Sequence, residues 1–399
     1  MKAKDPAQSD DVLTIARICR LQQLVSLTNG LDIGDNLLTG SLPSTLFSGL
    51  ASFVGYLNLK GNNFNGTLPT EVGYMSEITN FFDVSDNSIT GSIPSQFGLW
   101  TAMGDYFDLG QNSLTGTLPT DLGSWTDFSA YFDLSFNSLN GTLPSEFGGM
   151  NMLSYFSISD NGMSGSIPSQ FGLWTDMSNF FDLGQNSLTG TLPPALGSWT
   201  DFSSYFDVSD NSLSGTLPSE FGEMNVGNYF DISSNSMSGS IPSQFGKFDL
   251  TSYFSVKSNE LNGTIPTEVV AMANLNNYFD LSDNSLTGVI PSEIGLALQF
   301  SAYLSVASNG LDSTIPSQLG NLFGGDATLV VSVNNSIPAN LDLSHNSMSG
   351  TLPTQLGRMT ALQNTLQFDN NDFYGSIPST HLRYQGRCTI HFVLRYLNR

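Results

Sequence analysis

Residues 131–144 read Tyr-Phe-Asp-Leu-Ser-Phe-Asn-Ser-Leu-Asn-Gly-Thr-Leu-Pro, and close copies of this stretch recur along the chain. The asparagine at its seventh position returns fourteen times, at intervals of 24 to 26 residues with one longer gap of 37. A unit of this length cannot bury its own apolar side and must stack on copies of itself. The repeat therefore predicts a solenoid of about fourteen coils. The register asparagines are Asn36, Asn62, Asn87, Asn112, Asn137, Asn161, Asn186, Asn211, Asn235, Asn259, Asn284, Asn309, Asn346 and Asn371.

Each coil is predicted to contain two short parallel strands. Residues 131–134 alternate as a strand does, so Tyr131 and Asp133 point outward while the phenylalanine and leucine between and after them point inward. Asn137 then turns the chain, and stacked asparagines are expected to satisfy buried backbone groups at this bend. Residues 139–143 form the second strand, which the following proline ends. The rest of the coil is predicted to contribute one more set of apolar side chains to the core.

The pattern x-L-x-x-N-x-L-x-G-x-I-P-x-x-L-G, which covers roughly residues 24 to 380, resembles the plant-type subclass of leucine-rich repeats. The resemblance implies an α/β solenoid that is curved, with a parallel sheet on its concave side and irregular or short helical segments on its convex side. It also implies non-enzymatic recognition of proteins, peptides or glycans. The chain departs from the subclass in three ways: paired-cysteine caps are absent, Tyr-Phe replaces the usual leucines, and most coils have one extra residue.

The ends of the chain and one insertion depart from the repeat. Residues 1–23 are predicted to be an N-terminal cap, residues 24–378 the solenoid, and residues 379–399 a C-terminal cap or tail. The longer asparagine gap places an insertion at about residues 321–332, which is either a binding region or a tolerated loop.

Composition excludes several classes of partner. The formal net charge of −23 comes from 35 acidic and 12 basic residues, and such a surface disfavours nucleic acids and anionic membranes. No stretch reaches the ~18 to 20 apolar residues of a membrane span, so membrane insertion is not expected. Four N-x-Ser/Thr sequons, at Asn65, Asn140, Asn262 and Asn334, together with the resemblance, favour an extracellular or cell-surface location. An intracellular location stays open, because no signal peptide is present in the sequence given.

The outward residues of the first strand form an aromatic and an acidic column, the predicted ligand-binding face. Tyrosine offers rigid contact area with a polar tip, which suits recognition of a protein or glycan. The alternative is that stacked rings only stabilise neighbouring strands. The carboxylates invite protonation, a cation or a basic partner, although serines interrupt the column and make a divalent-cation track unlikely to be continuous. The predicted site is Tyr106, Asp108, Tyr131, Asp133, Tyr155, Tyr205, Asp207, Tyr229, Asp231, Tyr253, Tyr278 and Asp280.

The second strand carries paired hydroxyl columns. Paired threonines repeated on a flat solenoid sheet resemble the ice-binding faces of certain antifreeze proteins, so ice binding is the alternative function. The competing interpretation is the β-propensity of threonine on an exposed strand. The alternative site is Thr115, Thr117, Thr142, Thr189, Thr191 and Thr216.

Catalysis is not expected. All three histidines lie in the last 55 residues, and no nucleophile–base or metal-ligand spacing occurs. The sequence therefore predicts a non-catalytic recognition or scaffold protein without a cofactor.

Overall fold

The computed structural model describes residues 30–50, 53–270, 272, 274–296, 303–322, 340–359, 362, 365–377 and 389–391. Two units make up the chain, Met1–Ser187 and Leu188–Arg399. The predicted N-terminal cap (1–23) and most of the predicted insertion (321–332) lie outside the described residues.

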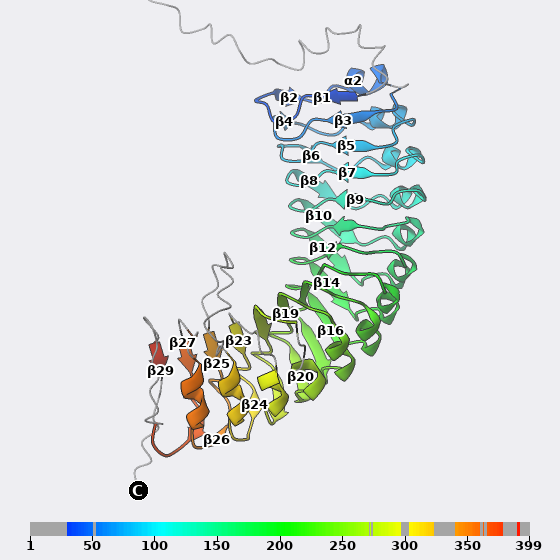
Figure 1. The fold of residues 1–399 in the computed structure, drawn as a ribbon. Helices are drawn as coiled ribbons and strands as arrows, with labels where there is room; N and C mark the ends of the chain where they lie inside the picture. The colour runs from blue at the N-terminus through cyan, green and yellow to red at the C-terminus, as the bar shows by residue number, and fades with distance from the viewer. Residues whose placement is uncertain are drawn as a thin grey trace, which may run out of the picture. The chain divides into compact units, whose positions relative to one another are not determined.

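In the first unit, one strand of each coil joins a long parallel sheet. A second strand follows each strand of this sheet, and a short helix follows the second strand (Figure 1). The strands of the long sheet are called long strands here, and the second strands, which form sheets of fewer strands, are called short strands, whatever their number of residues. The long strands are β1 (Gly30–Asp32), β3 (Tyr56–Asn58), β5 (Phe81–Asp83), β7 (Tyr106–Asp108), β9 (Tyr131–Asp133), β11 (Tyr155–Ser157) and β13 (Phe180–Asp182), in that spatial order. The short strands are β2 (Thr39–Ser41), β4 (Asn63–Asn65), β6 (Thr90–Gly91), β8 (Ser113–Gly116), β10 (Ser138–Thr142) and β12 (Gly162–Gly165). The helices are α2 (Ser44–Gly49) and the 3₁₀ helices η2 (Thr70–Tyr74), η3 (Ser95–Leu99), η4 (Thr120–Ser124), η5 (Ser145–Gly149) and η6 (Ser169–Leu173).

The second unit repeats this plan. Its long strands are β15 (Tyr205–Asp207), β17 (Tyr229–Asp231), β19 (Tyr253–Ser255), β21 (Tyr278–Asp280), β23 (Tyr303–Ser305), β25 (Asn340–Asp342), β27 (Thr365–Gln367) and β29 (Thr389–His391). Its short strands are β16 (Ser212–Thr216), β18 (Ser236–Gly239), β20 (Glu260–Thr264), β22 (Ser285–Gly288), β24 (Gly310–Leu311), β26 (Ser349–Gly350) and β28 (Asp372–Phe373), and β14 (Ser187–Gly190) begins at the last residue of the first unit. Its helices are α3 (Thr267–Val270), η7 (Pro194–Ser198), η8 (Ser219–Glu223), η9 (Ser243–Lys247), η10 (Ser292–Leu296), η11 (Ser317–Asn321) and η12 (Thr354–Arg358).

The register asparagines form the predicted ladder. The two amide hydrogens of Asn137 are shared among the carbonyl oxygens of Leu134 and Ser135 in its own coil and of Leu109 in the preceding coil, each at 3.1 Å. Its carbonyl oxygen accepts the backbone N–H of Leu114 at 2.9 Å. Each register asparagine from Asn62 onward thus ties two coils together, and Asn235 repeats the arrangement in the second unit. The residue before each asparagine has a positive φ of 50–63°, Phe136 among them, which makes the turn tight.

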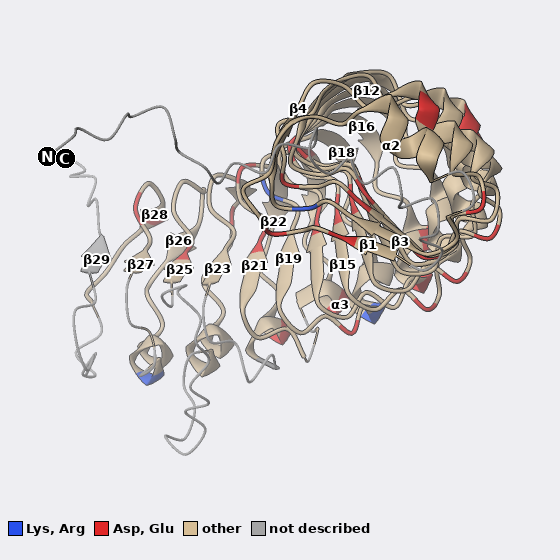
Figure 2. Ribbon diagram, turned by 90° about the horizontal axis from the view of Figure 1, so that it is seen from above, with Lys and Arg blue, Asp and Glu red and all other residues tan. Residues whose placement is uncertain are grey.

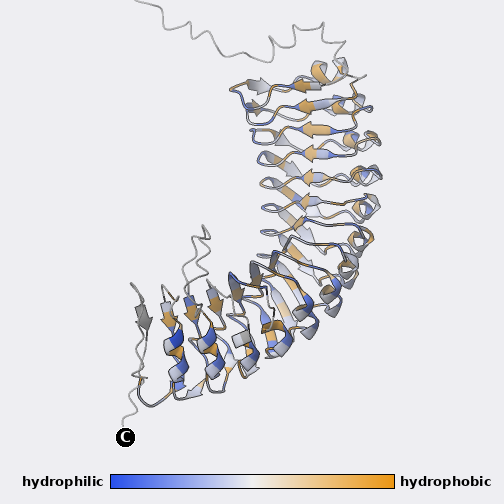
Figure 3. Ribbon diagram, viewed as in Figure 1, coloured by the Kyte–Doolittle hydropathy of each residue, from blue (hydrophilic) through white to orange (hydrophobic). Residues whose placement is uncertain are grey.

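The core is an aromatic spine. Phe107, Phe132 and Phe156 of the first unit are fully buried, and their stacked ring centroids lie 5.8 and 5.3 Å apart. Apolar residues (orange) recur on the long strands that contribute this spine (Figure 3). The helical rib adds buried tryptophans, and the indole N–H of Trp125 donates to the carbonyl oxygen of Phe97 in the preceding coil at 3.0 Å. The buried rings therefore both fill the coil and join it to its neighbour.

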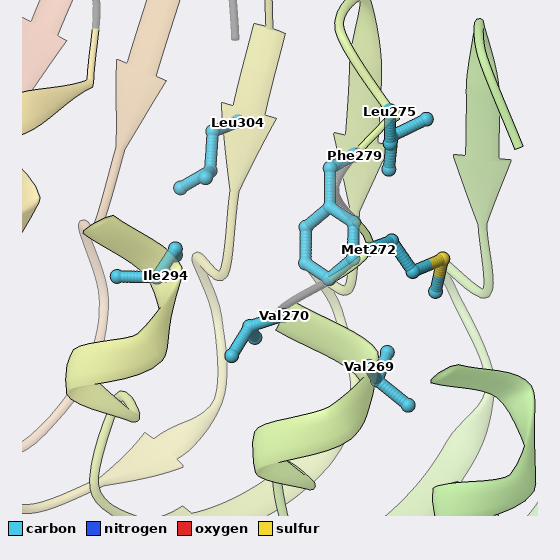
Figure 4. A pocket seen from close by; sticks show the side chains of 7 residues that line it. All are labelled: Val269, Val270, Met272, Leu275, Phe279, Ile294 and Leu304. Carbon is cyan, nitrogen blue, oxygen red and sulfur yellow. The ribbon is translucent and has the colours of Figure 1, made fainter. Parts of the chain in front are cut away.

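One small apolar cavity interrupts this packing in the second unit (Figure 4). Val269 and Met272 occupy the positions where the preceding coil has Phe245 and Phe248. The smaller side chains leave volume unfilled, because the neighbouring coils keep their spacing. The cavity is lined by Val269, Val270, Met272, Leu275, Phe279, Ile294 and Leu304.

Replacing Asn137 by Ala should lower the free energy of unfolding by about 3 kcal/mol, because four backbone groups in two coils lose their partner. Asn140→Ala is the matched control: this asparagine lies three residues further on, and its side chain is exposed. Urea denaturation monitored by circular dichroism measures both variants. Equal losses for the two would contradict the ladder's role.

Candidate recognition faces

The outward side of the long sheet carries a stacked tyrosine column, named here the tyrosine face. In the first unit it contains Tyr106, Tyr131 and Tyr155, whose ring centroids lie 4.3 and 4.1 Å apart with nearly parallel planes. In the second unit Tyr205, Tyr229, Tyr253, Tyr278 and Tyr303 are stacked at 4.2–4.5 Å. Straight stacking follows from the strand register, which pairs each tyrosine with the next, as Tyr106 with Tyr131. All of these side chains are half-buried.

The aspartates beside this column are not exposed, and in this respect the expected acidic surface was wrong. Asp108, Asp133, Asp207, Asp231 and Asp280 lie on the outward side of the sheet, as the alternation requires, yet none is more than 8% exposed. The reason lies in the tyrosine two residues earlier in each strand, which bends over the carboxylate and covers it. A side chain on the same side of the sheet can therefore still be buried.

Each buried carboxylate is satisfied within the protein. One oxygen of Asp133 accepts the backbone N–H of Ser135 at 2.8 Å, and the other accepts the hydroxyls of Tyr131 at 3.1 Å and Tyr155 at 3.4 Å. The same pair of contacts holds Asp108, Asp207, Asp231 and Asp280. These turns were not predicted, although the recurring Asp-Leu-Ser triplet is a sequence signal for them, because an aspartate readily accepts the N–H two residues on.

Burial changes the acidity of the face. Burial, and then the charges of Asp133 and Asp83, raise the pKa of Asp108 to about 7. Burial, and then the charge of Asp207, raises the pKa of Asp231 to about 6. Burial also raises the pKa of Tyr106 and Tyr131, so their hydroxyls keep their protons and donate to the carboxylates.

The short strands present a second face, named here the hydroxyl face, and all six threonines of the alternative site are exposed on it: Thr115, Thr117, Thr142, Thr189, Thr191 and Thr216. The strands do not stack residue for residue, as straight columns would require. Thr142 pairs with Ser164 and Thr216 with Ser238, so each strand is displaced by two residues relative to the next. The hydroxyls therefore form an oblique array.

This displacement places a glycine of one coil against a threonine methyl group of the preceding coil, an arrangement named here the glycine socket. Gly141 has a φ of +83°, and a β-carbon added there would lie only 2.8 Å from the γ-methyl carbon of Thr117 in the preceding coil. The missing side chain therefore makes room for the threonine methyl group, while the strain of a positive φ is avoided. Gly165 accommodates Thr142 in the same way.

The second unit also contains a shallow hollow of about 800 Å³ beside the hydroxyl face. Thr191, Thr216, Ser240 and Thr264 line one side, and the residues that begin the short helices, such as Pro218 and Glu220, line the other. The repeat pattern did not predict this hollow, because it forms only where the same segment of four successive coils lies side by side.

Charge and metal chemistry offer no further site within the described residues. Acidic residues (red) recur along the coils while basic ones (blue) are few (Figure 2). The described part of the chain contains no group of three or more His, Cys, Asp or Glu side chains that could hold a metal ion. None of the helices described is long and apolar enough to cross a membrane.

A sequence profile for the leucine-rich repeat matches residues 130–150, 204–224, 277–296 and 339–359. The chain is a leucine-rich-repeat protein. It resembles the plant-type subclass, since its coils follow that pattern and its structural relatives include plant receptor ectodomains. No curated protein matches this leucine-rich-repeat protein in sequence.

Three solved receptor structures share its fold. The ectodomain of the receptor kinase GASSHO1/SCHENGEN3 from Arabidopsis thaliana, in complex with CASPARIAN STRIP INTEGRITY FACTOR 2, has 29% identity and a TM-score of 0.72 over 93% of this chain and 45% of its own. The plant peptide hormone receptor RGFR1 in complex with RGF2 has 26% identity and a TM-score of 0.76 over 93% and 65% of the two chains. A TDR receptor has 26% identity and a TM-score of 0.78 over 94% and 66%. The leucine-rich-repeat protein thus spans less than two thirds of the length of each.

A plant ice-binding protein is also similar. It has 25% identity and a TM-score of 0.50, over 63% of this chain and 81% of its own.

The raised pKa of Asp108 predicts a specific pH dependence. Because the folded-state pKa of about 7 exceeds the ordinary aspartate value of 3.8, the folded protein holds a proton that the unfolded chain releases between these pH values. This contribution to stability is complete below about pH 4 and is lost as the pH rises through about 7. Asp108→Asn should therefore reduce the decline in the free energy of unfolding as the pH rises. At about pH 8 the variant should unfold at a higher urea concentration than the wild type does.

Asp105→Asn is the control, because Asp105 is exposed three residues earlier in the same coil. Urea denaturation at several pH values measures the difference. The stability of Asp108→Asn falling with pH as steeply as that of the wild type, or Asp105→Asn reducing the fall equally, would contradict this expectation. Either result would show that burial of Asp108 does not cause the pH dependence.

Proposed function

We propose that this leucine-rich-repeat protein is a non-catalytic recognition domain that binds a protein or peptide along its tyrosine face. The observation that carries the proposal is the locking of each tyrosine by a buried aspartate, as Tyr131 by Asp133 at 3.1 Å. Rings held in this way lose little conformational entropy when a partner binds. A face built of fixed tyrosines is therefore preorganised for contact.

The geometry favours a peptide over a glycan. A sugar ring packs on the face of an aromatic ring, but stacking at 4.1–4.5 Å covers both faces of the inner tyrosines and leaves their edges free. The hydroxyl of Tyr131 donates its proton to Asp133, so its oxygen presents lone pairs to a ligand. Backbone N–H groups of an extended peptide suit such a row of acceptors.

The relatives support the same ligand class and location. Two of the similar plant receptors, at 29% and 26% identity, were solved with a ligand bound. The GASSHO1/SCHENGEN3 ectodomain is in complex with CASPARIAN STRIP INTEGRITY FACTOR 2, and the peptide hormone receptor RGFR1 is in complex with RGF2. An ectodomain lies outside the cell, which supports an extracellular or cell-surface location for this chain. The chain spans only part of the length of these receptors, so the proposal does not extend to a signalling role.

Panning a random linear peptide library displayed on phage against the purified protein tests the proposal. Binding of enriched peptides should be lost in Tyr131→Ala and Tyr229→Ala, and weakened in Tyr131→Phe, which keeps the ring but removes both the acceptor oxygen and the hydrogen bond to Asp133. Thr142→Val, on the hydroxyl face, is the control and should bind as wild type does. Far-UV circular dichroism checks that each variant folds. Peptides that bind the tyrosine variants unchanged would overturn the assignment of the face.

Ice binding is the second candidate, and the hydroxyl face favours it. From Asn63 to Ser240, the outward side chains of the short strands carry no charge. Thr115 and Thr142 are exposed on strands that lie ~4.8 Å apart, and Thr117 is exposed directly after one of them, so hydroxyl and methyl groups repeat at regular intervals. A regular, uncharged array of this kind can order surface water, and similarity to a plant ice-binding protein supports the idea.

A freezing assay separates the two candidates. An ice-binding protein should show thermal hysteresis or inhibit ice recrystallisation, and Thr117→Tyr, Thr142→Tyr and Thr191→Tyr should abolish the effect because each disrupts the array. Ser145→Tyr, an equally large change at an exposed position of η5, should leave it intact. Absence of activity in the wild-type protein would exclude this candidate and leave the first untouched.

A further inference from the structure

Two kinds of asparagine occur in each of several coils, and they differ in availability. The register asparagines, such as Asn137, donate both amide hydrogens to backbone carbonyl oxygens. Asn65, Asn140 and Asn262 instead lie on the hydroxyl face with exposed side chains. Within the described part of the chain, no hydrogen bond engages the side chain of any of these three. Their amide groups are therefore open to chemistry that the register asparagines cannot undergo.

The three exposed asparagines share one local geometry. Each stands in a short strand, β4, β10 or β20, directly before a glycine with a φ of +73°, +83° or +77°. Each glycine is followed by an exposed threonine, which completes the triplet Asn-Gly-Thr.

The strand neighbours of these asparagines are small. Asn65 pairs with Ser41, Asn140 with Gly162, and Asn262 with Ser285. Glycine and serine leave free space above the sheet beside each amide. A bulky group attached to the amide nitrogen can therefore project into solvent without disturbing the coil.

We propose that Asn65, Asn140 and Asn262 are acceptors of N-linked glycans when the chain is made in a eukaryotic secretory pathway. The donor is an oligosaccharide carried on a lipid pyrophosphate. The amide nitrogen of asparagine forms a bond to the first sugar carbon, the bond from that carbon to the pyrophosphate oxygen breaks, and the lipid pyrophosphate leaves. The amide loses one proton in the exchange, and no oxidant or reductant is required.

The sites have a consequence for the two faces. A glycan at Asn140 stands between Thr117 of the preceding coil and Thr142 of its own, so it covers the centre of the alternative site. The tyrosines belong to the other, long sheet of the coil and stay uncovered. The glycosylated protein would therefore retain the tyrosine face for ligands and lose the hydroxyl face as a contact with ice.

Mass spectrometry of the full chain, secreted from eukaryotic cells behind an added leader, tests the proposal. The protein is treated with peptide N-glycosidase in heavy-oxygen water, which converts each glycosylated asparagine to labelled aspartate. Label is expected at Asn65, Asn140 and Asn262. Asn140→Gln and Thr142→Ala should each remove one glycan from the intact mass, the second while keeping the asparagine itself.

Asn63→Gln is the matched control, because Asn63 is exposed in the same strand as Asn65 but is not followed by the required threonine or serine. It should leave the glycan mass unchanged. Recovery of all three peptides without label, from cells that glycosylate a co-secreted reporter, would overturn the proposal, and an unlabelled peptide at one position would overturn it there. Neither result depends on whether the tyrosine face binds a peptide.

Discussion

The hydrogen bonds of the register asparagine are the interaction on which the structure depends. Asn137 satisfies backbone groups in its own coil and in the preceding one, at a bend where the chain has turned too sharply to pair with itself. No single coil could complete these bonds, since half of the partners belong to its neighbour. Stability is therefore a property of adjacent coils, as expected of a protein built by stacking.

The tyrosine and aspartate columns act as one unit. A net charge of −23 suggests an open acidic surface, but five aspartates of the long strands are covered by tyrosines and satisfied by backbone N–H groups: Asp108, Asp133, Asp207, Asp231 and Asp280. The cost of burying several carboxylates is reduced by protonation, which is why the pKa of Asp108 is raised to about 7. What the long sheet presents to solvent is a row of rigid aromatic edges and phenolic oxygens.

One coil thus presents two surfaces of different chemistry. The long strand presents aromatic rings whose hydroxyl protons are committed to Asp108, Asp133 and their equivalents, whereas the short strand presents exposed hydroxyls and amides. The first surface is fixed by internal bonds, and the second by the fit of threonine methyl groups into glycine sockets. Recognition of a peptide and attachment of glycans can therefore occupy different sides of the same repeat.

The sequence by itself determined the coil: the period, the inward Phe132 column, the turn at Asn137 and the two strands all follow from local alternation and from the regular return of one asparagine. The exposure of the six threonines could also be predicted, because residues two apart on a strand share a side. Only the tertiary structure decided that Asp133 is buried, since that requires Tyr155 of the next coil as well as its own tyrosine. It also decided the two-residue displacement of the short strands, which depends on how neighbouring coils pack and leaves no mark in the order of residues within one coil.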